Sequence, residues 1–496
     1  MKTMPAAVCT LVMMTFLYLT PPVHGQGLEI GSRLEPFMDH FLIDEMDNTA
    51  LRLHRPVPAN LVLHNQPGYL PLYNGMSVIH DGPVYLLYYS AANRLGVLES
   101  HNGRDWFRPA VGLLTGNTPD TNLVKTTTSD LMIPEDEPLP EVFLDTRPGI
   151  PANQRYKAFT LDERGSTKVH CWVSGNGKIW EKYQDDPIIE TRLYGAFDGF
   201  ESLFWSSSEN CYVLYIRYYL RGKTTEEGRR SIARMTSPDF KTWSQPRPMT
   251  FGDDGLTPPE HHYQNQTSPY FRAPHIYVAL SSRFMQGRSA FDAEPERARQ
   301  LKLARASQQV EDWLTSDISE TVVMTTRGGT HYDRAFMEGF VRPGLGDENW
   351  TTRSNYALRG IVPTGPGEMS LYVSRHNALP SVHIRRYTLR LDGIGSVHAS
   401  YQAGRMVTRP VTFTGTRLVI NFSTSAAGSI RVGLLNRDGL PIAGFETNRC
   451  MPLIGDHLKQ VVRWQDTADL SSVQGQPIRL VFEMQDADLY SLQFTP

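Results

Sequence analysis

Apolar residues along this chain fall into short runs of Val, Ile, Leu, Tyr and Phe, separated by clusters of Gly, Pro, Asn and Asp. Such runs, bounded by turn-forming residues, are typical of β-strands. Only residues 294–314 carry the Ala-, Glu-, Arg- and Leu-rich composition of a helix. The pattern therefore predicts an all-β protein with one helical insert.

One unit recurs along the chain. An aromatic-rich strand is followed by a second strand that ends in Ser or Thr, and an aromatic residue stands six positions after this hydroxyl residue, across a polar turn. The four pairs of hydroxyl and aromatic residues are Ser100 and Trp106, Ser174 and Trp180, Ser237 and Trp243, and Thr326 and Tyr332. A fifth, degenerate copy covers residues 369–389 without this turn.

Each unit corresponds to one twisted, four-stranded antiparallel blade whose polar turn joins the outer strands. A single blade leaves both faces uncovered, so several blades must stack around an axis. The five copies predict a five-bladed β-propeller over residues 30–400. A chain of β-sandwiches would explain the strands but not a turn repeated at constant internal spacing.

The pattern changes after Asp392. Residues 404–496 carry alternating strands, among them 416–422, 429–435 and 478–482. Some ninety residues of this kind predict a C-terminal β-sandwich. Its role is structural or carbohydrate-binding, and we favour a structural one because no row of exposed aromatic residues stands out.

Composition narrows the class of partner. The 496 residues allow two to four domains. Lys and Arg number 49 against 52 Asp and Glu, which gives a net charge of −3. No global basic field exists to hold a polyanion, so we expect no nucleic-acid partner.

The first residues resemble an export signal. Lys2 precedes an apolar run over residues 6–20, two prolines follow, and small or tolerated residues lead to Gly25. This predicts a signal peptide over residues 1–25, cut after Gly25. A membrane anchor is the alternative, but the run is shorter than the roughly 20 residues a span requires. We expect a secreted or periplasmic protein without a membrane span after cleavage.

Three cysteines follow this signal: Cys171, Cys211 and Cys450. Their odd number allows at most one disulfide, which would join Cys171 and Cys211, and the favoured alternative is three buried small hydrophobes. None lies near a histidine in zinc-ligand spacing, so we expect neither a metal nor another cofactor.

The repeated Ser-x-Asn-Gly-x-x-Trp turns at Ser100 and Ser174, the signal and the C-terminal sandwich together resemble glycoside hydrolase families 32 and 43, in an uncharacterised exported bacterial branch. The resemblance implies three carboxylates around a central funnel, on the innermost strands of the first three blades. Six-bladed sialidases are a weaker match, since their turn holds one more residue. The Asn-Asp-Pro-Asn-Gly motif of family 32 is absent, so the resemblance is architectural.

Candidate catalytic acids occur in three predicted inner strands. Asp198 and Glu201 enter the apolar strand of blade 3, beside Phe and Trp residues that would raise a carboxyl pKa and suit a general acid. A turn cap and an exposed edge are the alternatives for these two acids. Glu260 opens the inner strand of blade 4. Blade 2 holds the acids next in order, Glu135, Asp136 and Glu141, whereas blade 1 offers none.

Residues 260–266 form the densest polar cluster in the chain. Strand alternation would place the even-numbered side chains on one face and the odd-numbered ones on the other. We expect sugar contacts here and at the start of blade 5, with a solvated loop or inter-blade salt bridges as the alternatives. The predicted substrate-binding residues are His261, His262, Tyr263, Asn265, Gln266, Arg353 and Asn355. Neighbouring histidines face apart on a strand, which argues against metal chelation by this segment alone.

These observations predict an exported glycosidase that cleaves a plant or algal glycan with paired carboxylates. A non-catalytic glycan-binding propeller is the main alternative, because blade 1 lacks an acid. A scaffold for a partner protein is the third. The sequence leaves the sugar, the stereochemistry and the oligomeric state open.

Export gives the first testable prediction. If residues 1–25 are cleaved, N-terminal sequencing of protein from the periplasm or medium should begin near Gln26, because the small residue at Gly25 favours cleavage there. A product that retains Met1 in the cytoplasm would contradict the prediction.

Overall fold

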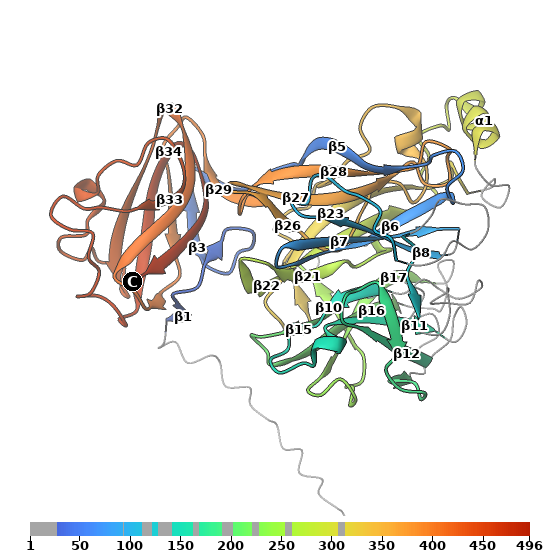
Figure 1. The fold of residues 1–496 in the computed structure, drawn as a ribbon. Coiled ribbons are helices and arrows are strands. Elements are labelled where there is room, and N and C mark those ends of the chain that lie inside the picture. The colour runs from blue at the N-terminus through green and yellow to red at the C-terminus, as the bar shows by residue number, and fades with distance from the viewer. Residues whose placement is uncertain are drawn as a thin grey trace, which may run out of the picture.

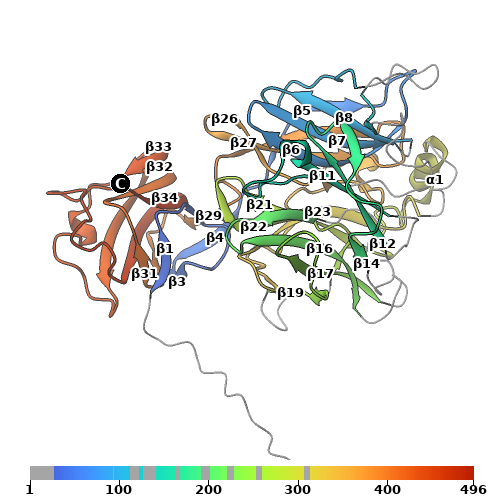
Figure 2. The ribbon, with the colours of Figure 1, turned by 60° about the horizontal axis from the view of Figure 1, so that its bottom comes forward.

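The computed structural model describes residues 27–92, 94–111, 122–126, 141–161, 168–190, 202–220, 228–252, 260–305 and 313–496. These residues form a ring of sheets and a smaller β-lobe at its side (Figures 1 and 2). The described part holds one α-helix, α1 (Pro295–Ala304), at the start of the predicted helical insert. None of the described helices has the length and apolar character needed to cross a membrane.

The ring consists of five antiparallel sheets. Blade 1 contains β6 (Leu72–Asp81), β7 (Val84–Ala91) and β8 (Arg94–Ser100). Blade 2 contains β10 (Glu141–Leu144), β11 (Tyr156–Leu161), β12 (Lys168–Ser174) and β13 (Ile179–Lys182). Blade 3 contains β15 (Ser202–Ser206), β16 (Cys211–Leu220), β17 (Arg229–Ser237) and β18 (Arg247–Pro248).

Blade 4 contains β20 (His261–His262), β21 (Thr267–Tyr270), β22 (Ala273–Met285) and β23 (Ile318–Thr326). Blade 5 contains β25 (Tyr356–Ala357), β26 (Val362–Gly365), β27 (Glu368–Arg375), β28 (His383–Arg390) and β5 (Val57–His64). The innermost strands β6, β10, β15 and β21 lie side by side in this order, and β25 and β26 close the ring. The predicted all-β, five-bladed propeller is confirmed.

The repeated turn has a specific hydrogen-bond pattern. The Oγ atoms of Ser100, Ser174 and Ser237 each accept a hydrogen bond, at 2.9 Å, from the backbone N–H three residues later. That third residue adopts a left-handed backbone, with φ of 68°, 72° and 71° at Gly103, Gly177 and Phe240. The hydroxyl therefore holds the turn in a shape that returns the chain to the blade.

The ring closes through β5, a strand that precedes blade 1 in the sequence. It pairs antiparallel with β28, with His64 opposite His383 and Val57 opposite Thr388. The outermost strand of the last blade thus comes from the beginning of the propeller sequence, which locks the ring.

The second lobe combines strands from both ends of the described chain. Its C-terminal strands are β29 (Gly395–Ala399), β30 (Gly404–Thr408), β31 (Val411–Phe413), β32 (Arg417–Asn436), β33 (Asp456–Val461) and β34 (Ile478–Thr495). Its N-terminal strands are β1 (Leu28–Gly31), β2 (Glu35–Pro36), β3 (Ile43–Asp47) and β4 (Thr49–Leu53). The boundaries predicted from the sequence, 30–400 and 404–496, placed β2, β3, β4 and β29 in the propeller, with the second half of β1. In the structure these strands belong to the second lobe: β1, β2, β3 and β4 pair with β31, β34, β30 and β29, and β29 also pairs with β34.

Two long strands shape the core of this lobe. β32 and β34 pair along their whole length, and their register shifts between Thr424 and Ser429. Opposite this shift, Asp486 has a φ of 42°. The bend allows both halves of β34 to bury side chains in one core, among them Phe482 and Phe494. The strands of this lobe form one ten-stranded sheet, and the β-sandwich stays a prediction.

The cysteines are thiols in this fold. Cys171, Cys211 and Cys450 are all free, and Cys171 and Cys450 are buried. Cys171 and Cys450 therefore fit the buried small hydrophobes that the sequence favoured, whereas Cys211 is partly exposed.

Asp392 joins the two lobes. Its carboxylate is fully buried and lies 2.5 Å from the Arg272 guanidinium of blade 4. It also accepts hydrogen bonds from the Tyr270 hydroxyl at 2.7 Å and, in the second lobe, from the Ser491 hydroxyl at 3.0 Å. The φ of Asp392 is 62°, a left-handed value that Asp and Asn tolerate better than most residues.

We expect Asp392→Asn to lower the free energy of unfolding by about 3–5 kcal/mol, since it leaves the Arg272 charge without its partner. The substitution keeps the side-chain shape and the backbone preference. Chemical unfolding followed by tryptophan fluorescence measures the loss. Asp456→Asn is the matched control: Asp456 is 67% exposed and pairs with Arg390 at the surface, so its loss should cost at most about 1 kcal/mol. Equal effects of the two substitutions would contradict the assignment.

Candidate active site in the propeller funnel

One end of the propeller axis lies at the second lobe. β21 ends at Tyr270, whose hydroxyl contacts Asp392 at the lobe junction. The inner strands of a propeller run in the same direction, so their beginnings meet at the opposite end of the axis. Side chains at these beginnings form the candidate site.

One buried polar residue stands within three residues of the start of each inner strand. These residues are Asn74, Glu141, Ser202, Gln266 and Asn355, each at most 5% exposed. Each has at least one side-chain oxygen or nitrogen without a hydrogen-bond partner among the described residues. Because unpaired buried polar groups are costly, such a ring is suited to a ligand rich in hydroxyl groups.

Glu141 is the acid of this ring. Its side chain is 4% exposed, and neither carboxyl oxygen has a hydrogen-bond partner in the described part of the chain. Burial raises the pKa of Glu141 to about 7, although the Arg359 charge 3.7 Å away opposes the shift. A carboxyl group that holds its proton near neutral pH can act as a general acid.

Arg359 reaches across the axis from blade 5. Its guanidinium donates to the carbonyl of Val142 in blade 2 and, at 3.3 Å, to the carbonyl of Leu203 in blade 3. Its backbone N–H donates to Met76 of blade 1 at 2.9 Å. Burial lowers the pKa of Arg359 and the Glu141 charge raises it. This residue therefore fills the axis at the level of Glu141.

Glu260, a predicted catalytic acid, has a different environment. Its carboxylate lies 2.8 Å from Arg283 and 2.7 Å from Arg334. Each carboxylate oxygen accepts a hydrogen bond from a guanidinium group, so both oxygens are already engaged within the fold. We assign Glu260 an ion-pairing role within blade 4. The other two predicted acids, Asp198 and Glu201, lie outside the described residues, as do Glu135 and Asp136 of blade 2.

The predicted alternation of residues 260–264 is present. His262 is buried, stacks on Phe251 with ring centres 4.6 Å apart, and has its pKa lowered to about 3 by burial. His261 and Tyr263 are partly exposed. The Arg230 guanidinium lies 4.8 Å from the centre of the Tyr263 ring. Among residues 260–264, the side chains on the Tyr263 face are therefore the partly exposed ones.

The remaining predicted contacts fall into two groups. The Asn265 side chain donates to Tyr332 and the Asn355 amide donates to Ser319, so both have structural bonds. Gln266 is fully buried with an unpaired side-chain amide and faces the polar ring. Arg353 is partly exposed and stacks over Trp313 at 4.5 Å.

Sequence reasoning missed Arg359 and ranked Glu141 below three other acids. For Arg359 the available signal was a charge inside the otherwise apolar segment 356–362. Glu141 gave little signal, because its burial depends on blades that are distant in sequence. In the described part, no group of three or more His, Cys, Asp or Glu residues is arranged to hold a metal ion.

No protein-family profile and no curated protein sequence matches this chain. It is similar to solved structures. One is an N-acetylgalactosamine deacetylase from F. plautii in complex with blood group B trisaccharide (11% identity, 69% of this chain and 96% of that one, TM-score 0.44). A thermostable family-43 glycoside hydrolase matches at 14% identity over 68% and 96% of the two chains, with a TM-score of 0.41.

An exo-inulinase from Aspergillus awamori covers more of the chain, 88%, and 98% of its own length, at 11% identity and a TM-score of 0.35. The solved structures with this similarity include propeller glycoside hydrolases. The similarity is one of architecture, and the chemistry of the site has to be argued from its own residues.

Replacing the ionisable side chain of Glu141 should stabilise the folded protein at high pH. The folded-state pKa of about 7 exceeds the ordinary 4.5. The folded protein therefore binds this proton more tightly, and the stability that Glu141 contributes is lost as pH rises through this window. Glu141→Gln removes the ionisation. At pH 8 the variant should exceed the wild type by up to about 3 kcal/mol in free energy of unfolding, and at pH 4 the two should be similar.

Glu260→Gln is the matched control for urea unfolding at both pH values. It leaves Arg334 without a counter-charge, although Arg283 keeps Glu320, and should be destabilised by about 3–5 kcal/mol at pH 8. A Glu141→Gln variant that is no more stable than the wild type at pH 8 would show that Glu141 is not a strained buried acid.

Proposed function

We propose that this protein is an exported glycoside hydrolase that cleaves a plant or algal polysaccharide in the propeller funnel. The observation that carries the proposal is the buried Glu141, whose pKa is raised to about 7 by burial, in a ring of unpaired polar groups. The sequence resemblance to propeller glycosidases, which rests on the repeated turns, supports the same reaction class. We place the protein outside the cytoplasm because of residues 1–25.

Glu141 is proposed to donate its proton to the glycosidic oxygen. As the bond breaks, Glu141 becomes a carboxylate 3.7 Å from the Arg359 guanidinium. The cation therefore stabilises a charge that develops only during the reaction, which is the contribution that accelerates a chemical step. Glycosidases require a second carboxylate, as base or nucleophile. Glu201 immediately precedes Ser202 of the polar ring and is the proposed partner, with Asp198 next.

The rim of the funnel supports a sugar ligand. Trp313, Tyr263 and Arg353 lie together, with the Arg353 guanidinium 4.5 Å from Trp313 and 5.5 Å from Tyr263. Tyr73, 41% exposed, is within 3.5 Å of the same guanidinium. Aromatic faces pack against sugar rings, and Arg donates to their hydroxyl groups.

A non-catalytic glycan-binding propeller is the second candidate. The observation that favours it lies in blade 1, where Asn74 holds the ring position that Glu141 holds in blade 2. An amide binds hydroxyl groups but cannot act as a base. In this alternative the funnel would retain a glycan without cleaving it.

The test is reducing-sugar release from a panel of plant and algal glycans. Glu141→Gln and Glu201→Gln should each lower kcat by about 10²–10⁴-fold, because each removes a proton-transfer or carboxylate step. Asp198→Asn tests the alternative partner. Glu338→Gln, at an exposed site, is the control that should keep full activity. The wild-type kcat/KM should fall as pH rises above about 7, where the proposed acid loses its proton.

Binding separates the two candidates. If the wild type binds a glycan but releases no reducing sugar, the binding-propeller alternative holds. If Glu141→Gln retains full hydrolysis, Glu141 is not the proton donor.

A further inference from the structure

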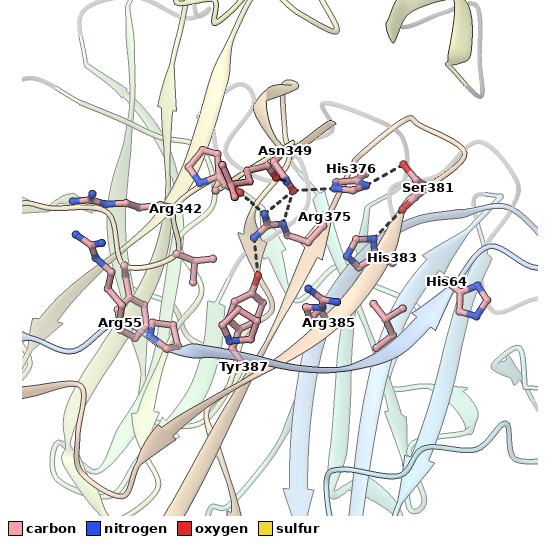
Figure 3. Close-up of a pocket in the computed structure, with 18 residues that line it drawn as sticks. Arg55, His64, Arg342, Asn349, Arg375, His376, Ser381, His383, Arg385 and Tyr387 are labelled. Atoms are coloured by element: carbon pink, nitrogen blue, oxygen red, sulfur yellow. Dashed lines mark hydrogen bonds between the residues drawn. The ribbon is translucent and has the colours of Figure 1, made fainter. Parts of the chain in front are cut away.

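A separate pocket lies between blade 5 and the segment that links blades 4 and 5. It has a volume of about 630 Å³ and is lined by strands β5, β27 and β28 and by residues 340–349 (Figure 3). None of the five residues of the polar ring is among the described residues that line it. The Asn349 carbonyl, which accepts a hydrogen bond from Asn355 at 2.9 Å, connects the wall of the pocket to the polar ring.

The lining of this pocket carries only one sign of charge. Among the described residues, four arginines and three histidines line it, and no Asp or Glu does. The arginines are Arg55, Arg342, Arg375 and Arg385. Since the whole chain has a net charge of −3, this is a local concentration of positive charge on a slightly acidic protein.

Arg375 is the most informative of them. It is 8% exposed, and its guanidinium donates to the Tyr387 hydroxyl at 2.7 Å and to the Asn349 amide oxygen at 2.6 Å. These acceptors, and the carbonyl of Pro343, are all neutral. Among the described residues, the other buried arginines each have a carboxylate within 4 Å: Arg334 has Glu260, Arg359 has Glu141 and Arg386 has Glu368. Arg375 has none.

The neighbouring arginines of the pocket are also without a carboxylate partner among the described residues. Arg55, Arg342 and Arg385 make no ion pair with any described residue, and the Arg385 Nε atom is buried without a hydrogen-bond partner. In Figure 3, Arg385 lies below Arg375, toward strand β5. Arg342 and Arg55 lie together at the left of the view. Several donors thus surround one space.

The positive charges of this pocket also affect the pKa of a histidine in its lining. His376 shares the Asn349 amide oxygen with Arg375, at 2.9 Å. Burial, with the charges of His383 and Arg375, lowers the pKa of His376 to about 4. Three donor atoms, two from Arg375 and one from His376, thus converge on an oxygen with two lone pairs. The pocket is rich in donors and poor in acceptors.

We propose that this pocket binds an oxyanion, a sulfate ester or a carboxylate, carried by the polysaccharide that the propeller recognises. Guanidinium groups bind both oxyanions through paired, charge-assisted hydrogen bonds. The substrate class is then an anionic glycan. This inference rests on the proposed function for the sugar chain, whereas the oxyanion site itself rests on the pocket alone.

The experiment measures binding by titration calorimetry with four glycans: a sulfated galactan, the same galactan after desulfation, a polygalacturonate and its methyl ester. Inorganic sulfate is a fifth probe that needs no sugar recognition. The test protein is the Arg342→Gln/Arg385→Gln double variant. Arg463→Gln, an exposed arginine of the second lobe with the same change of charge, is the control. Arg342→Gln alone, at an exposed position, guards against loss of folding.

We expect the wild type to bind one of the two anionic polymers at least about tenfold more tightly than the uncharged form of that polymer. The double variant should lose this difference in affinity, and Arg463→Gln should keep it. Preference for the galactan identifies a sulfate ester, and preference for the polygalacturonate identifies a carboxylate. Inorganic sulfate should bind the wild type and not the double variant.

Equal binding of charged and uncharged forms, or an anion preference that the double variant retains, would overturn the oxyanion site. Glu141→Gln should keep the preference, because it lies in the funnel. If no glycan is hydrolysed but the preference is present and lost in the double variant, the proposed reaction fails and the oxyanion site holds.

Discussion

The burial of the Arg359 charge is the constraint on which the centre of this molecule depends. A guanidinium removed from water is costly unless acceptors surround it. Here the acceptors come from blades 2 and 3, while the backbone of Arg359 bonds to blade 1. One side chain of blade 5 thereby fixes the mutual positions of four blades. It also determines where Glu141 lies and how readily that carboxyl group gives up its proton.

The parts of the fold set by local chemistry were predictable from the sequence. The turn that begins at Ser174 depends on a hydroxyl, an αL residue and an aromatic within seven positions, and these define a blade without knowledge of its neighbours. The pairing of β5 with blade 5 and of β1 to β4 with the second lobe was not predictable in this way. His64 and His383 form a pair across more than three hundred residues, and no local pattern records such a register.

The site shows the same division. The polar cluster at 260–266 was recognisable because so many polar residues rarely share a strand, but its roles depend on partners. Glu260 is an ion-pair acid only because Arg283 and Arg334 reach it from other segments. Arg375 is the opposite case. Unlike the other buried arginines among the described residues, it has no carboxylate partner, and nothing in the sequence around it indicates this. Electrostatic roles emerge from tertiary proximity, which sequence spacing does not encode.

The strand β5 has a consequence for how the chain acquires its structure. Val57–His64 are synthesised before any complete blade, yet their partner β28 ends at Arg390, and β1 waits longer still for β31. Neither lobe can complete its sheets until most of the polypeptide has left the ribosome. Contacts of such long sequence separation slow folding. The native pairing of both lobes therefore forms late relative to the synthesis of the chain.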